Sequence, residues 1–377
     1  MKHEGYTPQL VPVGTIDQIK LGKRYTHNDI CFPCQMVIGE AIDALRAGGW
    51  QGRQDEVAVA MVKFQCDCRL SHYAALLRKA LDAAGFDRVP VLTTDGGDSK
   101  NMHPGTMLLE PGVIISALWA FMMLDILTDL ARKTRPYEVV PGSTNELYER
   151  SVQALGHALE SGLTAAIRTF SQAIDDFAAL PYDRSTLKPR VLVTGELLVT
   201  YHPGSNFHIE EYLEGCGMET IFPRVTSQLR KDFLAGAAHR QDFHADTDPS
   251  GIIVGKVFDL AQSTMERIAR KHPLFTPEPS PARLYEGVSD MIPETLSCGE
   301  GWLMAAEIAH YARKGVRSFV ILQPFGCIPN HVCGRGMTKR LKDEFPQIQI
   351  LPLDLDPDTS FANVENRLQM LVMNDGG

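Results

Sequence analysis

The chain has 377 residues, a formal net charge of −9, and a composition that is 44% hydrophobic and 22% charged. This length favours two domains, and the composition is that of a folded protein. The acidic balance provides no basic field, so no nucleic-acid partner is expected. The N-terminal segment is polar, and the longest apolar stretch, Val113–Leu124, is too short to span a bilayer. We therefore expect a cytoplasmic protein with no membrane partner.

The N-terminal part alternates apolar runs with helical spacing. Val57–Phe64 is β-branched and predicts a strand, Tyr73–Ala84 predicts a helix that ends at Gly85, and Val89–Leu92 predicts a second strand. Strand, helix and strand at this spacing indicate a parallel βαβ unit. A helical region follows, at Gly112–Lys133 and Ser143–Phe177. A linker is predicted after it, at Pro181–Pro189.

A second α/β series begins at Val191. The segment His239–Gly251 is rich in Asp, His and Ser and predicts a loop. The predicted strands are 191–193, 219–221, 318–322 and 348–351, and the predicted helices are 209–214, 261–271, 302–314, 337–344 and one that starts at 361.

This order predicts an α/β fold with two Rossmann-like parallel-sheet lobes, an added helical region and a metal cluster between the lobes. The predicted lobes are residues 1–185, which include the helical insertion, and residues 186–377. Seven of the eight cysteines form two groups, one in each lobe: Cys31, Cys34, Cys66 and Cys68 in the first, and Cys298, Cys327 and Cys333 in the second.

The predicted elements place these cysteines on loops. Cys66 and Cys68 follow the first strand, and Cys327 and Cys333 follow the strand that ends at Leu322, so both pairs lie at carboxyl ends where open parallel sheets bind ligands. Cys31 and Cys34 precede a helix predicted over 36–46, and Cys298 precedes the 302–314 helix. A helix N-terminus stabilises a thiolate. Four loops are thus expected to meet around one buried anionic centre, for which iron–sulfur ligation is favoured.

Other interpretations of these residues stay open. A structural zinc site needs four thiolates, although its ligands usually lie on short knuckles, and the Cys31/Cys34 pair also fits a redox dithiol. His331 is a candidate proton donor or outer-sphere partner of Cys333, and His202 is a similar candidate in the second lobe. Arg69 and Arg335 flank cysteines and could offset cluster charge. The eighth cysteine, Cys216, is expected to be a core thiol.

Several motifs are absent from the sequence. There is no GxxxxGK[ST] phosphate loop, no glycine-rich dinucleotide fingerprint after either first strand, and no GxSxG elbow. The chain is therefore expected to bind no nucleotide itself.

Six segments resemble the 2-hydroxyacyl-CoA dehydratase/activase-related superfamily, and more narrowly the cysteine-rich module that closes its long members and also occurs alone. The resemblance covers about Lys23 to about Leu371. Its segments are NDICFPCQMVIGEAIDAL, CRLSHYAALLRKALDAAGFDRVPV, RPYE at 135–138, VTGELLVTYHPGSNFHIEEYLE, SCGEGWLMAAEIAHYARKGV and QPFGCIPNHVCGRGM.

The resemblance implies Rossmann-like lobes around an iron–sulfur cluster, which a separate ATPase of the sugar-kinase/actin type supplies with low-potential electrons. The cysteines of the family correspond to Cys31, Cys68, Cys298 and Cys327. Cys34, Cys66 and Cys333 are additional in this chain, and some relatives hold a double cubane with three cysteines on each half. A single [4Fe–4S] cluster and a double-cubane [8Fe–9S] cluster are therefore both expected possibilities.

The favoured hypothesis is an anaerobic oxidoreductase, the cluster-bearing component of an ATP-dependent reductase system. The alternatives are a carrier or maturation scaffold for iron–sulfur clusters, a 2-hydroxyacyl-CoA dehydratase-like lyase subunit, and a structural zinc protein. The resemblance also favours a homodimer or hetero-oligomer. The substrate is not written in the motifs.

Overall fold

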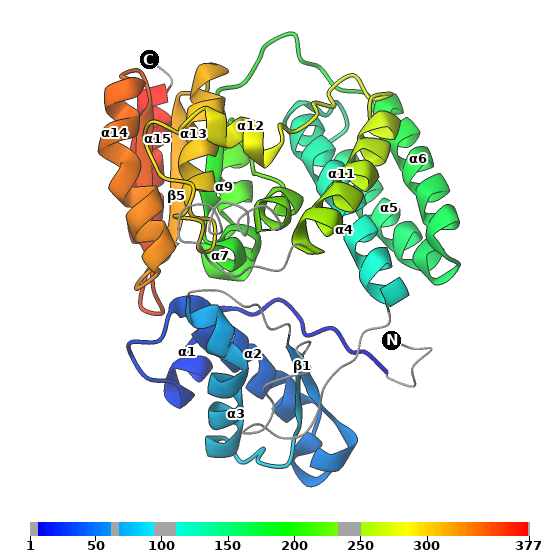
Figure 1. Ribbon diagram of the computed structural model, residues 1–377, viewed down its shortest axis with the longest axis vertical. Coiled ribbons are helices and arrows are strands. Elements are labelled where there is room, and N and C mark those ends of the chain that lie inside the picture. The colour runs from blue at the N-terminus through cyan, green and yellow to red at the C-terminus, as the bar shows by residue number, and fades with distance from the viewer. Residues whose placement is uncertain (1–6, 62–67, 94–110, 233–249, 376–377) are drawn as a thin grey trace.

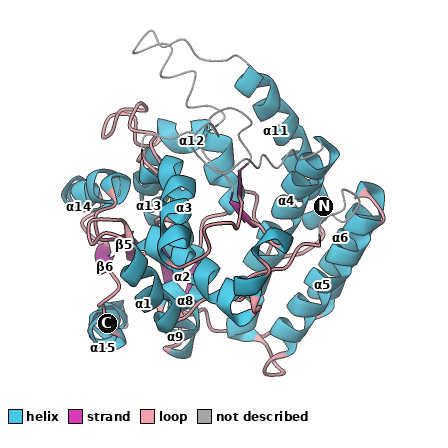
Figure 2. Cartoon of the chain, turned by 90° about the horizontal axis from the view of Figure 1, so that it is seen from below, coloured by secondary structure: helices cyan, strands magenta, loops and turns pink. Residues whose placement is uncertain are grey.

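A computed structural model describes residues 7–61, 68–93, 111–232 and 250–375 (Figure 1). The fold is mixed α/β, and its strands form two separate parallel sheets. In Figure 1 the N-terminal elements lie below, and the C-terminal sheet and a group of long helices lie above them. Figure 2, viewed from below, places α4, α5 and α6 on one side of the molecule and α13, α14 and α15 on the other.

The N-terminal part is a parallel βαβ unit that two helices precede in the chain. Strands β1 (Val59–Met61) and β2 (Val91–Thr93) pair in parallel, and α3 (Tyr73–Ala83) lies between them in the chain. The predicted unit is confirmed, although β2 begins two residues later than expected. Before it come α1 (Ile16–Tyr25) and α2 (Phe32–Ala47).

Helices α1 and α2 pack very closely because two glycines face the opposite backbone. A Cβ atom on Gly22 would lie 1.7 Å from the Gln35 carbonyl oxygen, and one on Gly39 would lie 1.8 Å from that of Gln18. Any larger residue at either position would separate the helices.

Four long helices form a bundle: α4 (Pro111–Thr134), α5 (Ser143–Glu160), α6 (Leu163–Ala179) and α11 (Ser250–Ala269). The predicted helical region at Ser143–Phe177 consists of two helices, because the chain turns at Gly162, whose φ of +106° suits glycine. The bundle core contains Met122, Met123 and Phe170. The predicted loop His239–Gly251 is wrong at its end, since α11 already begins at Ser250; residues 239–249 lie outside the described residues.

Helix α4 also bears on the membrane prediction. The segment Gly112–Tyr137 is, by length and composition, long and apolar enough to cross a bilayer, so the apolar stretch is longer than the sequence analysis counted. Its Asp125 carboxylate accepts hydrogen bonds from Val225 N and Thr226 N, and its Asp129 pairs with Lys133 and Arg224. One face of α4 is therefore held by polar contacts to the segment that follows strand β4 (Glu219–Ile221).

The C-terminal sheet has four parallel strands in the order β4-β3-β5-β6. They are β3 (Arg190–Gly195), β4 (Glu219–Ile221), β5 (Ser318–Pro324) and β6 (Gln349–Leu355). Leu192 and Ile321 belong to the core on one face, whereas Val193 and Leu322 belong to the core on the other. Helices cover both faces, as parallel sheets require.

The helices predicted at 209–214, 302–314, 337–344 and from 361 agree with the structure to within one residue. Helices α12 (Pro281–Glu286), α13 (Trp302–Arg313) and α14 (Thr338–Glu344) lie on one face. The remaining helices are α7 (Leu197–Tyr201), α8 (Pro203–Asn206), α9 (Ile209–Gly215) and α15 (Phe361–Asp375). The helix predicted at 261–271 begins much earlier, at Ser250 of α11, and α7, α8 and α12 were not predicted.

Helix α2 takes part in two cores. Phe32 and Met36 pack in the cluster formed by β3, β5, β6, α9 and α15. Ile38 and Ile42 pack in the cluster formed by α3, β2 and the rest of the N-terminal part. The helix therefore fixes the N-terminal part against one face of the C-terminal sheet.

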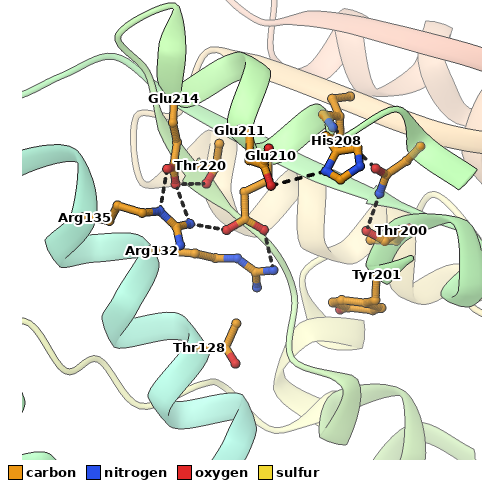
Figure 3. A network of polar contacts seen from close by, with 12 residues as sticks. Thr128, Arg132, Arg135, Thr200, Tyr201, His208, Glu210, Glu211, Glu214 and Thr220 are labelled. Carbon is orange, nitrogen blue, oxygen red and sulfur yellow. Dashed lines mark hydrogen bonds and ion pairs between the residues drawn. The ribbon is translucent and has the colours of Figure 1, made fainter. Parts of the chain in front are cut away.

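The clamp between the bundle and the sheet is ionic (Figure 3). Arg135, just after α4, pairs with Glu214 at 2.6 Å and with Glu210, and Arg132 pairs with Glu210 at 2.8 Å. Glu214 also accepts a hydrogen bond from Thr220 on β4. The arginine of the RPYE segment thus holds α4 against α9, and this is a structural role.

Candidate cysteine site

The loops after β3 and β5 form the centre of the candidate site. In the order β4-β3-β5-β6, the chain leaves β3 toward β4 on one side and leaves β5 toward β6 on the other. A crevice for ligands forms beyond the carboxyl ends of two such neighbouring strands. Glu196 follows β3 directly and Cys327 lies three residues after β5, so both belong to this crevice edge.

Two contacts bring further cysteine loops to the Cys327 loop. Arg69, next to Cys68, donates from Nη1 to the Gly326 carbonyl oxygen at 3.3 Å. Gly299, next to Cys298, has a φ of +56°, and a Cβ atom there would lie 3.3 Å from Cγ of Pro329. The loops of Cys68, Cys298 and Cys327 therefore lie against one another, although they are far apart in the sequence.

Cys31 and Cys34 lie at the start of α2, and the predicted start of this helix was too late. The helix begins at Phe32, so Cys31 is its N-cap and Cys34 lies within its first turn. Pro33 permits this early start because a proline fits the first turn, where its missing N–H is not needed. Both thiols are buried, and Cys31 Sγ lies 2.9 Å from the Tyr73 hydroxyl.

Asn330 connects Cys327 with a buried carboxylate. Its Nδ2 donates to Cys327 Sγ at 3.3 Å and to Glu300 Oε2 at 3.1 Å, and the residue has no exposed surface. Glu300 Oε1 accepts a 2.7 Å bond from Leu197 N in the loop after β3. These bonds fix the Cys298, Cys327 and β3 loops relative to each other.

A buried lysine holds the loop of Cys298. Lys231 Nζ donates to the carbonyl oxygens of Ser297 at 2.5 Å and Gly299 at 2.6 Å, and it pairs with Asp232 at 2.7 Å. Cys333 is buried nearby, with Sγ 3.9 Å from the Leu296 carbonyl oxygen. Lys231 thus places a positive charge between two cysteine segments.

Burial opposes the ionisation of four of the thiols. It raises the pKa of Cys31 and of Cys34, raises that of Cys327 to about 12, and raises that of Cys333 to about 11. Arg69 works in the opposite direction at Cys31 and Cys34, and Lys231 does so at Cys333. A thiolate in this site therefore needs further positive charge, which a bound metal would supply.

Two buried carboxyl groups lie among these cysteines. Burial and then repulsion from Glu300 raise the pKa of Glu196 to about 8, and burial also raises the pKa of Glu300. Glu196 Oε2 accepts a bond from Val199 N and so caps α7. Glu196, Glu300, Asn330 and Lys231 were not predicted as site residues from the sequence. The position of Glu196 directly after a buried strand was the one available signal.

The histidines and the second arginine bind other partners. His331 Nδ1 donates to the Cys327 carbonyl oxygen at 2.7 Å, and its Nε2 lies 3.7 Å from Asp354. Arg335 pairs with the same Asp354 at 2.8 Å. His202 Nε2 donates to Glu40 at 2.9 Å, since its Nδ1 accepts from Ser205 N. Each of these contacts fixes a loop, and the proton-donor role of His331 stays a prediction.

The two remaining cysteines differ. Cys66 lies outside the described residues. Cys216 was expected in the core, but this is wrong: it caps the end of α9 and is exposed, because the chain turns outward at Gly217 with a φ of +85°. Among the residues described, no three His, Cys, Asp or Glu side chains are grouped as the ligands of a metal ion. Each ligand of a cubane binds a different iron, so cluster ligands stand further apart than those of one ion.

Two comparisons with known proteins were negative. No protein-family model matches the chain, and no curated protein matches it with significance.

Proposed function

We propose that this chain is the iron–sulfur-bearing component of a cytoplasmic, ATP-dependent, low-potential reductase system. Its lobes would be Rossmann-like, with the cluster held between them. The observation that carries the proposal is the meeting of the cysteine loops: Arg69 bonds to Gly326, and Gly299 lies against Pro329. Loops from both parallel sheets thereby meet beyond the carboxyl ends of β3 and β5.

The donor set fits a cluster in its chemistry. Thiolates are the ligands that iron–sulfur clusters use, and Cys31, Cys34 and Cys333 are buried without a disulfide. Arg69 and Lys231 offset negative charge at the same place. The residues that would hold the cluster are Cys31, Cys34, Cys66, Cys68, Cys298, Cys327 and Cys333. A bound cluster would supply one-electron transfer at low potential.

The residues of the chain would support such a group in three ways. Burial of the cysteines excludes water, which lowers the dielectric around the thiolates. The Asn330 amide donates to Cys327, and hydrogen bonds to ligating sulfurs are one of the features that set the reduction potential of a cluster. The fully buried Lys231 fixes the Cys298 loop, so this ligand would be held before a cluster binds.

The electron donor in this proposal is a separate ATPase of the sugar-kinase/actin type. The support is the absence of a nucleotide motif in the sequence together with the presence of a thiol site. A supporting result would be reduction of the anaerobic protein only when an ATPase of this class and ATP are both added. Transfer of the cluster to an apo-protein during turnover would instead favour a carrier.

Iron and sulfide analysis of anaerobically purified protein tests the proposal. About eight irons per chain are expected for a double cubane and about four for a single cubane. Replacing Cys34 or Cys333 by serine should lower the iron content if these additional thiols are ligands. Cys216→Ser is the matched control, because this exposed cysteine lies at the end of α9. Iron near zero in the wild-type protein would refute the proposal.

A further inference from the structure

A small, partly open cavity lies next to the cysteine site, with Glu300 in its wall. It has a volume of about 20 Å³ and is bounded by the ends of β3 and β4 and by α13. A cavity of roughly 10–15 Å³ is enough for one water molecule, so this cavity has room for one and for little more. Its walls include Thr194, Thr200, Arg224, Glu300 and Glu307.

Three residues in the cavity wall carry buried polar atoms that make no hydrogen bond within the protein, although Arg224 Nη1 forms a 3.7 Å ion pair with Glu266. These atoms are Thr200 Oγ1, Arg224 Nη1 and Gln228 Oε1. The side chains of Thr200 and Arg224 are almost completely buried. A buried polar atom without a partner costs about 1–3 kcal/mol, so three such atoms around one cavity call for a ligand that can hydrogen-bond.

The two carboxyl groups of the cavity complete the set of possible partners. Thr194 Oγ1 donates to Glu307 Oε2 at 2.9 Å, and Glu300 Oε2 accepts from Asn330, which also donates to Cys327. Burial raises the pKa of Glu307 well above its usual range, and the charges of Glu278 and Glu300 add to this effect. Tyr201, Tyr311 and Arg224 also lie near these acids. The carboxyl groups of Glu300 and Glu307 therefore both lie at the wall of this cavity.

We infer that this cavity is a binding site for one ordered water molecule, held by Thr200, Arg224 and Gln228 beside the carboxyl groups of Glu307 and Glu300. The water accepts from Arg224 Nη1 and Thr200 Oγ1, and it donates to Gln228 Oε1 and to one carboxyl oxygen of Glu300 or Glu307. Three or four partners are usual for a buried water. This water site does not require a bound cluster, so its test is independent of the proposed function.

A crystal structure at a resolution that shows ordered water is the direct test. The expected result is one density peak within hydrogen-bonding distance of Thr200 Oγ1, Arg224 Nη1 or Gln228 Oε1. A dry or collapsed cavity would overturn the inference. Both outcomes can be read from the protein whether or not it contains iron.

A pair of variants tests the same inference in solution. Thr200→Val removes one partner of the water and should increase the unfolding equilibrium constant about fivefold. Thr134→Val is the matched control, because the Thr134 hydroxyl is also buried without a partner but does not line the cavity. Its replacement should leave the constant unchanged or lower it, since no bond is lost. Equal increases for the two variants would contradict the water site.

Discussion

Single residues set the electrostatics of the cysteine site. The thiols lie in an apolar setting in which burial opposes ionisation, and Arg69 and Lys231 are the cations that act on them. Glu196 and Glu300 bring two carboxyl groups into the same space. Acids that are buried close together resist ionisation, which makes the stability of this site depend on pH.

The first prediction concerns this pH dependence. The pKa of Glu196 rises from 4.5 to about 8 on folding, so between these values the folded state binds more protons than the unfolded state. The free energy of unfolding therefore falls as the pH rises through this window, and the loss is complete above about pH 8. Glu196→Gln can still cap α7 but does not titrate. Urea unfolding between about pH 5 and about pH 8 should show a smaller fall for this variant than for the wild type.

The control for this measurement is Glu149→Gln, a change at an exposed position of α5. It should preserve the wild-type fall in stability. If Glu196→Gln behaves like the control, then Glu196 is already ionised in the folded protein at neutral pH and the prediction is wrong.

At the scale of elements, two contacts between helices have different causes: ion pairs join α4 to α9, and small glycine residues allow α1 to approach α2. The ionic clamp of Arg132 and Arg135 with Glu210 and Glu214 joins α4 to α9 (Figure 3). The contact of α1 with α2 depends on Gly22 and Gly39 instead.

Arg135→Met should lower the free energy of unfolding by about 2–4 kcal/mol, because it leaves two partly buried carboxylates with fewer partners. Arg340→Met is the control, since Arg340 pairs with Asp290 where both side chains are about half exposed or more. Exposed pairs contribute about 0–1 kcal/mol. Urea denaturation measures the free energy of unfolding of both variants. A similar small decrease in the two would show that the ionic clamp contributes little to stability.

Gly22→Ala should cost about 3 kcal/mol or more, since the new methyl group would overlap the Gln35 carbonyl oxygen at 1.7 Å. Gly156→Ala in α5 is the matched control, because no atom lies within 4 Å of a Cβ atom added at that position. In an exposed helix the same exchange stabilises by about 0.5–1 kcal/mol. The melting temperature should therefore fall for Gly22→Ala and rise for Gly156→Ala. A shift in the same direction for both variants would refute the close-contact argument.

The alternation of strands and helices could be predicted from the sequence because hydrophobic periodicity is local. The βαβ unit, β3 to β6 and the cysteine loops at strand ends follow from it. The start of α2 at Phe32 was missed, since a single proline in the first turn decides it. Lys231, Glu300 and Asn330 were missed for another reason. Their roles arise from contacts between distant loops, and no local pattern marks a buried lysine or asparagine.

At the scale of the whole molecule, the two sheets share a helix rather than a linker. Because α2 contributes Phe32 and Met36 to one core and Ile38 and Ile42 to another, loss of either core weakens the other. The three tryptophans report on different cores: Trp50 on the N-terminal part, Trp119 on the bundle and Trp302 on the C-terminal sheet.

The final prediction is that the two sheets unfold together. In a variant that retains only Trp50 and in one that retains only Trp302, the fluorescence midpoint in urea should equal the far-UV circular-dichroism midpoint of the same variant, and Met36→Ala should lower the midpoint in both. The expected cost of removing this buried side chain is about 2–5 kcal/mol. The exposed Met373→Ala is the control and should leave both midpoints unchanged. A shift of the Trp302 midpoint alone would mean that the sheets unfold independently.

The shared helix also limits how this protein could be divided or recombined. A fragment that began at Pro111 would lack Ile19, Phe32 and Met36, and the apolar cluster that they share with β3, β5 and β6 would face solvent. Such a surface invites aggregation. Any chimera or fusion that borrows the C-terminal sheet must therefore carry α1 and α2 with it, and with them Cys31 and Cys34. The thiols at the start of α2 and the sheet that bears Cys327 are inherited as one unit.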